Sequence, residues 1–205
     1  MTIEYHNPTP IGFYDLSENE RHLIFNEIVS KKDLIESLYQ KNSWNNYVES
    51  TLNNVANIFV DHDFHFCYSI TNRYFLMYLN EIKNSFLFLS NSLNSLNLRL
   101  RESWFNRTKK HGFQNTHDHV PASISGVYYY DINSPNHHEG IEFNLFTQEE
   151  KFCYGSSLEI VYNYAPGRII FFPSYLPHNV HYNKTNEDRL SFSFNFYSTN
   201  GKSNV

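Results

Sequence analysis

The chain has 205 residues, a net charge of −5, and 16 lysines and arginines that do not gather into a basic stripe. This charge balance argues against nucleic acid as the main partner. No apolar run is long enough to span a bilayer, and the first ten residues hold neither a basic nor an apolar segment, so we expect a cytoplasmic protein without a membrane partner. The length fits a single domain over residues 1–205.

The first half of the chain predicts helices. Residues 3–13 contain two prolines and predict an irregular segment or an edge strand. Ser17 and Glu20 have the spacing of a capping box, and the apolar residues after them predict a helix over about Ser17–Ser30. Of two further helical repeats, the second predicts the longest helix, which we expect to cover one face of a sheet. The first repeat is Leu52, Val55, Ala56 and Phe59, and the second is Phe75, Leu79, Ile82, Phe86, Leu89 and Leu93.

The second half of the chain predicts strands. The spacing of apolar residues changes to two at Leu96, Leu98 and Leu100, and aromatic residues gather in runs such as VYYYD and FSFNFY. A helical part over residues 14–95 would therefore precede roughly eight short strands over residues 96–198. This order predicts an α+β protein with a cupin-like double-sheet jelly roll, a double-stranded β-helix, and N-terminal helices packed on one sheet.

Three histidines of the predicted β core could converge on one metal ion. His117 and His119 are two residues apart, so in an extended segment their side chains point the same way while Asp118 points the other way. His178 follows another strand-like run, GRIIFFPSYLPH, and a closed double sheet can bring it close to the pair. Imidazole binds iron, zinc, copper and nickel alike, so these residue types alone do not identify the metal.

Other histidines are weaker candidates. A single histidine in an aromatic-rich protein is usually a hydrogen-bonded core or surface residue, and only the joint pattern above indicates a site. His62 and His65 lie in a predicted loop without a third ligand nearby. His137 and His138 lie in the loop SPNHHEG, whereas His181 follows His178 by three residues and could contact the site from behind the ligands.

The order and spacing of these motifs resemble a known superfamily over about Trp104 to Phe196. An H-x-H pair followed by SGVYY and later by FPSxLxH is similar to the pattern of one group of iron(II)- and 2-oxoglutarate-dependent oxygenases. The resemblance implies that His117 and His178 bind iron. It also implies that Arg189 binds the remote carboxylate of 2-oxoglutarate and that Tyr129 lines the pocket of this co-substrate.

The chain departs from this superfamily at His119. Most members have H-x-D, whose carboxylate completes a two-histidine, one-carboxylate metal site. Here His119 takes that place, and we expect three nitrogen ligands, with Asp118 as the alternative ligand. A neutral third ligand leaves the site one negative charge short, which can change its redox behaviour and its metal preference.

The resemblance implies a dioxygenase that hydroxylates an unknown small-molecule or peptide substrate while 2-oxoglutarate is decarboxylated to succinate. One alternative is a cupin-like dioxygenase with three histidines that does not use 2-oxoglutarate; it explains His119 better but leaves Arg189 without a role. Another is a non-catalytic jelly-roll module that binds a metal. Arg189 itself could instead be a solvated charge at the end of a strand, beside Glu187 and Asp188.

Overall fold

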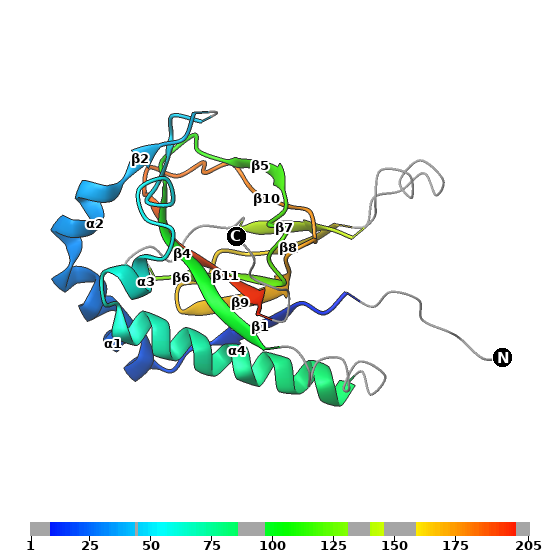
Figure 1. The fold of residues 1–205 in the computed structure, drawn as a ribbon. Helices are drawn as coiled ribbons and strands as arrows, with labels where there is room; N and C mark the ends of the chain where they lie inside the picture. Colours follow the sequence, from blue (N-terminus) through cyan, green and yellow to red (C-terminus); the bar gives the residue numbers. More distant parts are fainter. Residues whose placement is uncertain (1–8, 44, 86–96, 131–139, 146–158, 200–205) are drawn as a thin grey trace, which may run out of the picture.

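The computed structural model describes residues 9–43, 45–85, 97–130, 140–145 and 159–199, which form helices and two antiparallel sheets (Figure 1). No helix in these ranges is both long and apolar enough to cross a membrane. The helices are α1 (Glu18–Ser30), α2 (Lys32–Leu38), α3 (Ile58–Asp61) and α4 (His65–Ser85).

The strands form one large and one small sheet. The seven-stranded sheet has the order β1-β9-β6-β11-β4-β3-β2, and the four-stranded sheet has the order β5-β10-β7-β8. The strands are β1 (Gly12–Asp15), β2 (Gln40–Lys41), β3 (Val48–Ser50), β4 (Leu98–Thr108), β5 (Gln114–His117), β6 (Ile124–Tyr129), β7 (Ile141–Asn144), β8 (Glu159–Tyr162), β9 (Arg168–Pro173), β10 (His178–Val180) and β11 (Arg189–Ser198). The eight strands β4 to β11 of the described part agree with the number expected after residue 96.

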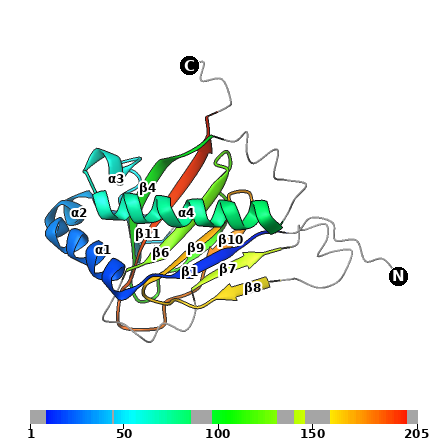
Figure 2. The ribbon, with the colours of Figure 1, turned by 90° about the horizontal axis from the view of Figure 1, so that it is seen from below.

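The large sheet separates two layers of apolar side chains. On one face, aromatic side chains of β9 and β11 pack against α1 and α4, as when Phe196 stacks on Phe75 with ring centroids 3.6 Å apart. On the other face, Val127 and Phe172 pack against Phe143 of the small sheet. Figure 2 shows α4 lying across the strands of the large sheet, and in Figure 1 the small sheet lies on the side away from the helices. Successive side chains of a strand point to opposite faces of the sheet, and this alternation produces the two apolar layers.

Strand β11 shows how one strand serves both layers. Its phenylalanines, Phe192 and Phe194, are fully buried among the residues packed against the helices. Ser191 and Ser193, which alternate with these phenylalanines, turn small polar side chains to the opposite face, where they line a cavity. Small side chains leave open space at this point between the two sheets.

Several sequence-based expectations about the first half are confirmed. Ser17 is the N-cap of α1, and both hydrogen bonds of the capping box with Glu20 are present. Strand β1 is an edge strand of the large sheet. It begins at Gly12, so the expected edge strand is present at the C-terminal end of the segment 3–13. Helix α4 is the longest described helix, and its Phe75 and Ile82 are buried. The last members of its repeat, Phe86, Leu89 and Leu93, lie outside the described residues, as does Leu96.

The expected helix through Leu52, Val55, Ala56 and Phe59 is wrong. Residues 51–54 form a turn, and only Ile58–Asp61 is helical in this region. Thr51 explains the difference, because its amide donates to the Phe105 carbonyl and its hydroxyl accepts from the Phe105 amide, both at 3.1 Å. These bonds to β4 hold the chain in a turn that helical spacing alone does not reveal. Helix α2 and strands β2 and β3 were not predicted either.

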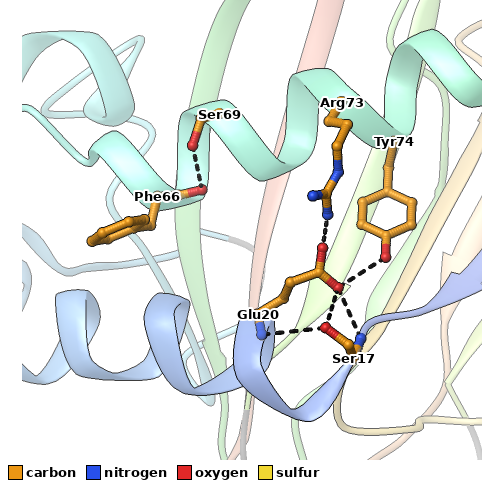
Figure 3. Close-up of polar contacts among 6 residues, drawn as sticks. All are labelled: Ser17, Glu20, Phe66, Ser69, Arg73 and Tyr74. Atoms are coloured by element: carbon orange, nitrogen blue, oxygen red, sulfur yellow. Dashed lines mark hydrogen bonds and ion pairs between the residues drawn. The ribbon is translucent and has the colours of Figure 1, made fainter.

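The capping box of α1 also connects two helices (Figure 3). The Glu20 carboxylate accepts hydrogen bonds from the Ser17 amide at 2.9 Å and from the Tyr74 hydroxyl of α4 at 3.1 Å, and it pairs with Arg73. The residue that satisfies the first turn of α1 therefore also holds α1 against α4.

We expect Ser17→Ala to lower the free energy of unfolding by about 1 kcal/mol, because the first turn of α1 loses its side-chain cap. Urea denaturation measures this change. Ser30→Ala is the control, since Ser30 is exposed in the last turn of the same helix and should change the value by less than about 0.5 kcal/mol. Equal effects of the two substitutions would contradict a specific role for the cap.

Candidate metal centre

The three candidate histidines meet where β5 and β10 pair. His117 ends β5, His178 begins β10, and the two residues are direct partners in this antiparallel pair. The His117 ring centroid lies 4.4 Å from that of His178 and 5.1 Å from that of His119. One ligand atom from each of the three lies within 4.8 Å of the others, and the described residues contain no second group of this kind. The sequence-based expectation that these rings converge therefore agrees with the structure.

His119 reaches this group from the segment just after β5. Its backbone amide donates to the Ser174 carbonyl at 2.9 Å, and its ring lies 5.7 Å from the Trp104 ring. The neighbouring Asp118 is exposed, and its carboxylate accepts a hydrogen bond from the Val120 amide at 3.0 Å. Asp118 is not part of the three-histidine group.

The hydrogen bonds of two rings leave the same nitrogen available for a metal. Nδ1 of His117 lies 2.7 Å from the Asn115 carbonyl, and Nδ1 of His178 lies 2.9 Å from the Leu176 carbonyl. When each Nδ1–H donates to its carbonyl, Nε2 keeps its lone pair for a metal ion.

The surroundings of two of the rings, those of His119 and His178, keep them neutral. Burial lowers the pKa of His178 to about 3, with the nearby His117 and His119 adding to this effect. Burial also lowers the pKa of His119 to about 4, again with a contribution from His117. Neutral imidazoles at pH 7 are what a metal ion requires of such ligands. Three nitrogen donors in a partly buried group fit a divalent transition metal.

A cavity of about 570 Å³ connects the three histidines with Arg189 and Tyr129, all of which line its wall. Arg189 begins β11 and is only 4% exposed, so it is not the solvated strand-end charge considered as an alternative. A guanidinium donor of Arg189 bonds to the backbone carbonyl of His181. The cavity therefore combines a candidate metal centre with a buried cation.

Tyr129 lies on the same wall, on the strand next to β11. Burial raises the pKa of Tyr129 well above its ordinary value, although the positive charge of Arg189 opposes this effect. The Tyr129 ring packs against that of Tyr164, with centroids 4.6 Å apart. Tyr129 therefore remains a phenol at pH 7 and can donate a hydrogen bond into the cavity.

The weaker histidine candidates lie elsewhere. Nε2 of His181 lies 2.7 Å from a carboxylate oxygen of Glu142, and its link to the site is the backbone carbonyl that contacts Arg189. His62 and His65 do not join the three-histidine group. His137 and His138 lie outside the described residues.

Several polar residues of the cavity were not predicted from the sequence. Asn106 of β4 faces Ser191 of β11, which in turn faces Tyr129 of β6, so the three form a row across the large sheet. The Asn106 amide also donates to the Ser193 hydroxyl at 3.1 Å. Serines alternating with phenylalanines in RLSFSFNFY were the available signal, because they place small polar groups on one face of a strand.

Comparison with known proteins identifies a similar family. Residues 102–195 match the model of a family described as "Putative 2OG-Fe(II) oxygenase". No curated protein sequence matches the chain. The resemblance of this chain to the iron(II)- and 2-oxoglutarate-dependent oxygenase superfamily is thereby confirmed.

Solved structures show the same fold at low sequence identity. A prolyl-4-hydroxylase of Pseudomonas putida is 14% identical, with 92% of each chain covered and a TM-score of 0.58. HygX of Streptomyces hygroscopicus, solved with nickel, 2-oxoglutarate and hygromycin B, is 13% identical, with 94% of this chain and 84% of HygX covered and a TM-score of 0.54. The epimerase SnoN, solved with Fe3+, alpha ketoglutarate and nogalamycin RO, is 13% identical, with 91% of this chain and 78% of SnoN covered and a TM-score of 0.60.

We expect His119→Ala to lower the affinity for iron(II) at least about tenfold, because one of three nitrogen donors is lost. Asp118→Ala should change the affinity far less, since the Asp118 carboxylate is exposed and bonds to the Val120 amide. Anaerobic titration of iron(II) into the parent and the two variants measures both effects. A larger loss in Asp118→Ala would make the carboxylate the ligand and remove His119 from the site.

Proposed function

We propose that this protein is an iron(II)- and 2-oxoglutarate-dependent dioxygenase that hydroxylates a substrate bound in the same cavity. The observation that carries the proposal is that the three histidines and the buried Arg189 line one cavity. His117, His119 and His178 hold the iron in this proposal. Arg189 and Tyr129 bind 2-oxoglutarate.

Arg189 suits the remote carboxylate of 2-oxoglutarate, because a planar guanidinium can donate two parallel hydrogen bonds to a carboxylate. Its bond to the His181 carbonyl fixes one side of the guanidinium and orients the rest. Tyr129 adds a neutral donor near this cation, and its packing against Tyr164 restricts its ring. These contacts orient the co-substrate before reaction.

When bound, iron(II) with 2-oxoglutarate and dioxygen supplies the oxidising chemistry, with 2-oxoglutarate decarboxylated to succinate as the substrate is hydroxylated. The chain supplies position, charge and exclusion of water. The neutral rings of His119 and His178 present lone pairs at pH 7. Apolar walls from Val127 and Phe172 keep bulk water from the centre.

The all-nitrogen group favours a second candidate, a cupin-like dioxygenase that does not use 2-oxoglutarate. This candidate explains His119 but gives the buried Arg189 no ligand. Iron-dependent conversion of 2-oxoglutarate to succinate would support the first proposal. Oxygen consumption without 2-oxoglutarate would support the second, and absence of both reactions in the iron-loaded protein would favour a non-catalytic module.

We also propose that the two sheets form a jelly roll within a single domain. Support comes from the strand order, in which β9-β6-β11-β4 and β5-β10-β7-β8 share the eight strands of the second half between two sheets. The helices α1 and α4 share one buried cluster with β9 and β11, which supports a single domain.

We expect Arg189→Met to weaken the binding of 2-oxoglutarate by about 2 to 5 kcal/mol, because the co-substrate carboxylate loses its buried partner. Metal affinity should stay nearly unchanged. Calorimetry measures the binding of 2-oxoglutarate with the zinc-loaded protein and the metal affinity by titration of zinc into the metal-free protein. Arg101→Met, at an exposed position of β4, is the matched control and should bind 2-oxoglutarate like the parent. Equal affinity in Arg189→Met and the parent would remove Arg189 from the site.

We expect His178→Ala to abolish iron-dependent formation of succinate, because the metal loses a buried ligand. His181→Ala should keep a measurable rate, since the contact of His181 with Arg189 is made by the backbone carbonyl and survives the substitution. A coupled assay for succinate compares the two variants with the parent. Activity in His178→Ala together with inactivity in His181→Ala would show that the ligand is misassigned.

A further inference from the structure

The cavity extends beyond the three histidines and Arg189 into a region lined by uncharged polar side chains. We call this region the amide arm. It is formed by Asn42, Ser50, Asn53, Asn106, Gln114 and Asn115. The binding of iron and 2-oxoglutarate proposed above uses none of these six side chains, although the Asn115 backbone carbonyl orients the His117 ring.

Strand register places the amide arm next to the metal centre and away from Tyr129. Ser50 of β3 faces Asn106 of β4, and the same row continues through Ser191 to Tyr129 at its other end. Gln114 and Asn115 belong to β5, the strand that ends at His117. A molecule in the amide arm can therefore approach the metal centre while 2-oxoglutarate occupies the region of Arg189 and Tyr129.

The turn that carries Asn53 is held firmly in place. Thr51, at the start of this turn, is fully buried and exchanges hydrogen bonds with Phe105 of β4. The Asn54 side chain accepts from Gln40 and donates to the Leu38 carbonyl, both at 2.8 Å. A binding group on such a fixed turn loses little conformational freedom when a ligand binds.

The amide arm offers hydrogen bonds that the protein does not use. Among the described residues, the side-chain amides of Asn42, Asn53, Gln114 and Asn115 make no hydrogen bond to the protein, and those of Asn53 and Asn115 are exposed to solvent. Asn106, whose amide donates to Ser193, is only 5% exposed. Each amide both donates and accepts, and so does a hydroxyl group. The amide arm therefore matches a ligand that carries several hydroxyls.

Charge also bears on which ligand the amide arm can hold. Among the described residues that line the cavity, Arg189 is the one permanently charged side chain. The described residues of the amide arm include no aspartate, glutamate or lysine. A carboxylate, phosphate or ammonium group in the amide arm would therefore find no side chain of opposite charge there. This lining favours an uncharged substrate part.

One aromatic side chain of the cavity wall favours a ring compound as the ligand. Trp104 lines the cavity beside His119 and offers an aromatic surface to the apolar C–H face of a ring.

We propose that the amide arm binds an uncharged, hydroxyl-rich ring compound, such as a sugar or a cyclitol, as the substrate. This inference rests on the proposed function, because it assumes that 2-oxoglutarate occupies the region of Arg189. It names the chemical class of the substrate and adds Asn53 and Asn106 as residues that determine specificity.

The test uses the full chain loaded with zinc and 2-oxoglutarate, which binds substrate without turnover, and follows ligand binding by saturation-transfer NMR. The probes are myo-inositol and a matched set that keeps one ring and changes its charge: glucose, glucosamine, glucuronate and glucose 6-phosphate. We expect a neutral probe to bind at least about tenfold more tightly than the charged members. Asn53→Ala should weaken that binding about five- to tenfold, as expected for the loss of one hydrogen bond.

Two further variants sharpen the test. Asn46→Ala is the control, because Asn46 is exposed on the loop between β2 and β3 and does not line the cavity; it should leave binding unchanged. Asn53→Asp adds a carboxylate at the arm and should shift preference toward glucosamine. Because Asn106 is buried, the rim residue Asn53 keeps the test independent of folding defects.

Binding of charged probes as tight as that of neutral ones, or no binding of any neutral probe, would overturn the inference. So would equal effects of Asn53→Ala and Asn46→Ala. Calorimetry of 2-oxoglutarate with the same zinc-loaded parent distinguishes a wrong substrate class from a wrong proposed function. If 2-oxoglutarate binds and the neutral probes do not, only the substrate class is wrong, whereas failure of 2-oxoglutarate to bind overturns the proposed function as well.

Discussion

The antiparallel pairing of β5 with β10 is the constraint on which the site depends. It places His178 directly opposite His117, although the two residues are far apart in the sequence. A slip of one residue would turn His178 to the other face of the sheet. The short segment before β10 also fixes the third ring, because the Ser174 carbonyl binds the His119 amide and the Leu176 carbonyl binds the His178 ring. One pairing and one connecting segment therefore set all three positions.

Strand β11 connects stability with chemistry in a similar way. Phe192 and Phe194 pack toward the helices, so the helical layer holds the strand in register. The same alternation turns Arg189, Ser191 and Ser193 into the cavity. Because the two faces belong to one backbone, packing against the helices also fixes the guanidinium of Arg189 relative to the metal centre.

Local patterns in the sequence predicted much of this arrangement. Period-two spacing predicted the strands of the second half, and the capping box predicted the start of α1 at Ser17. The histidine pair was recognisable because residues two apart in an extended segment point the same way, although His119 lies just after β5 and its amide is held by the Ser174 carbonyl. The turn at Thr51 was not predictable in this way, because its conformation depends on hydrogen bonds to the distant Phe105. The wall that carries Asn53 was missed for the same reason, as helical spacing of apolar residues suggested a helix there.

Charge distinguishes the two parts of the cavity, the region of the three histidines and Arg189 and the amide arm. In the proposed metal site, three neutral histidines around a divalent metal would leave two positive charges at the centre, and Arg189 would add one more nearby. A carboxylate at the third ligand position would have cancelled one of these charges. In the proposed function, the two negative charges of 2-oxoglutarate are then the main compensation, so they strengthen the preference of the Arg189 region for this dianion. The amide arm, with no charge of its own among the described residues, is left to recognise a neutral substrate by hydrogen bonds, which keeps co-substrate and substrate from exchanging places.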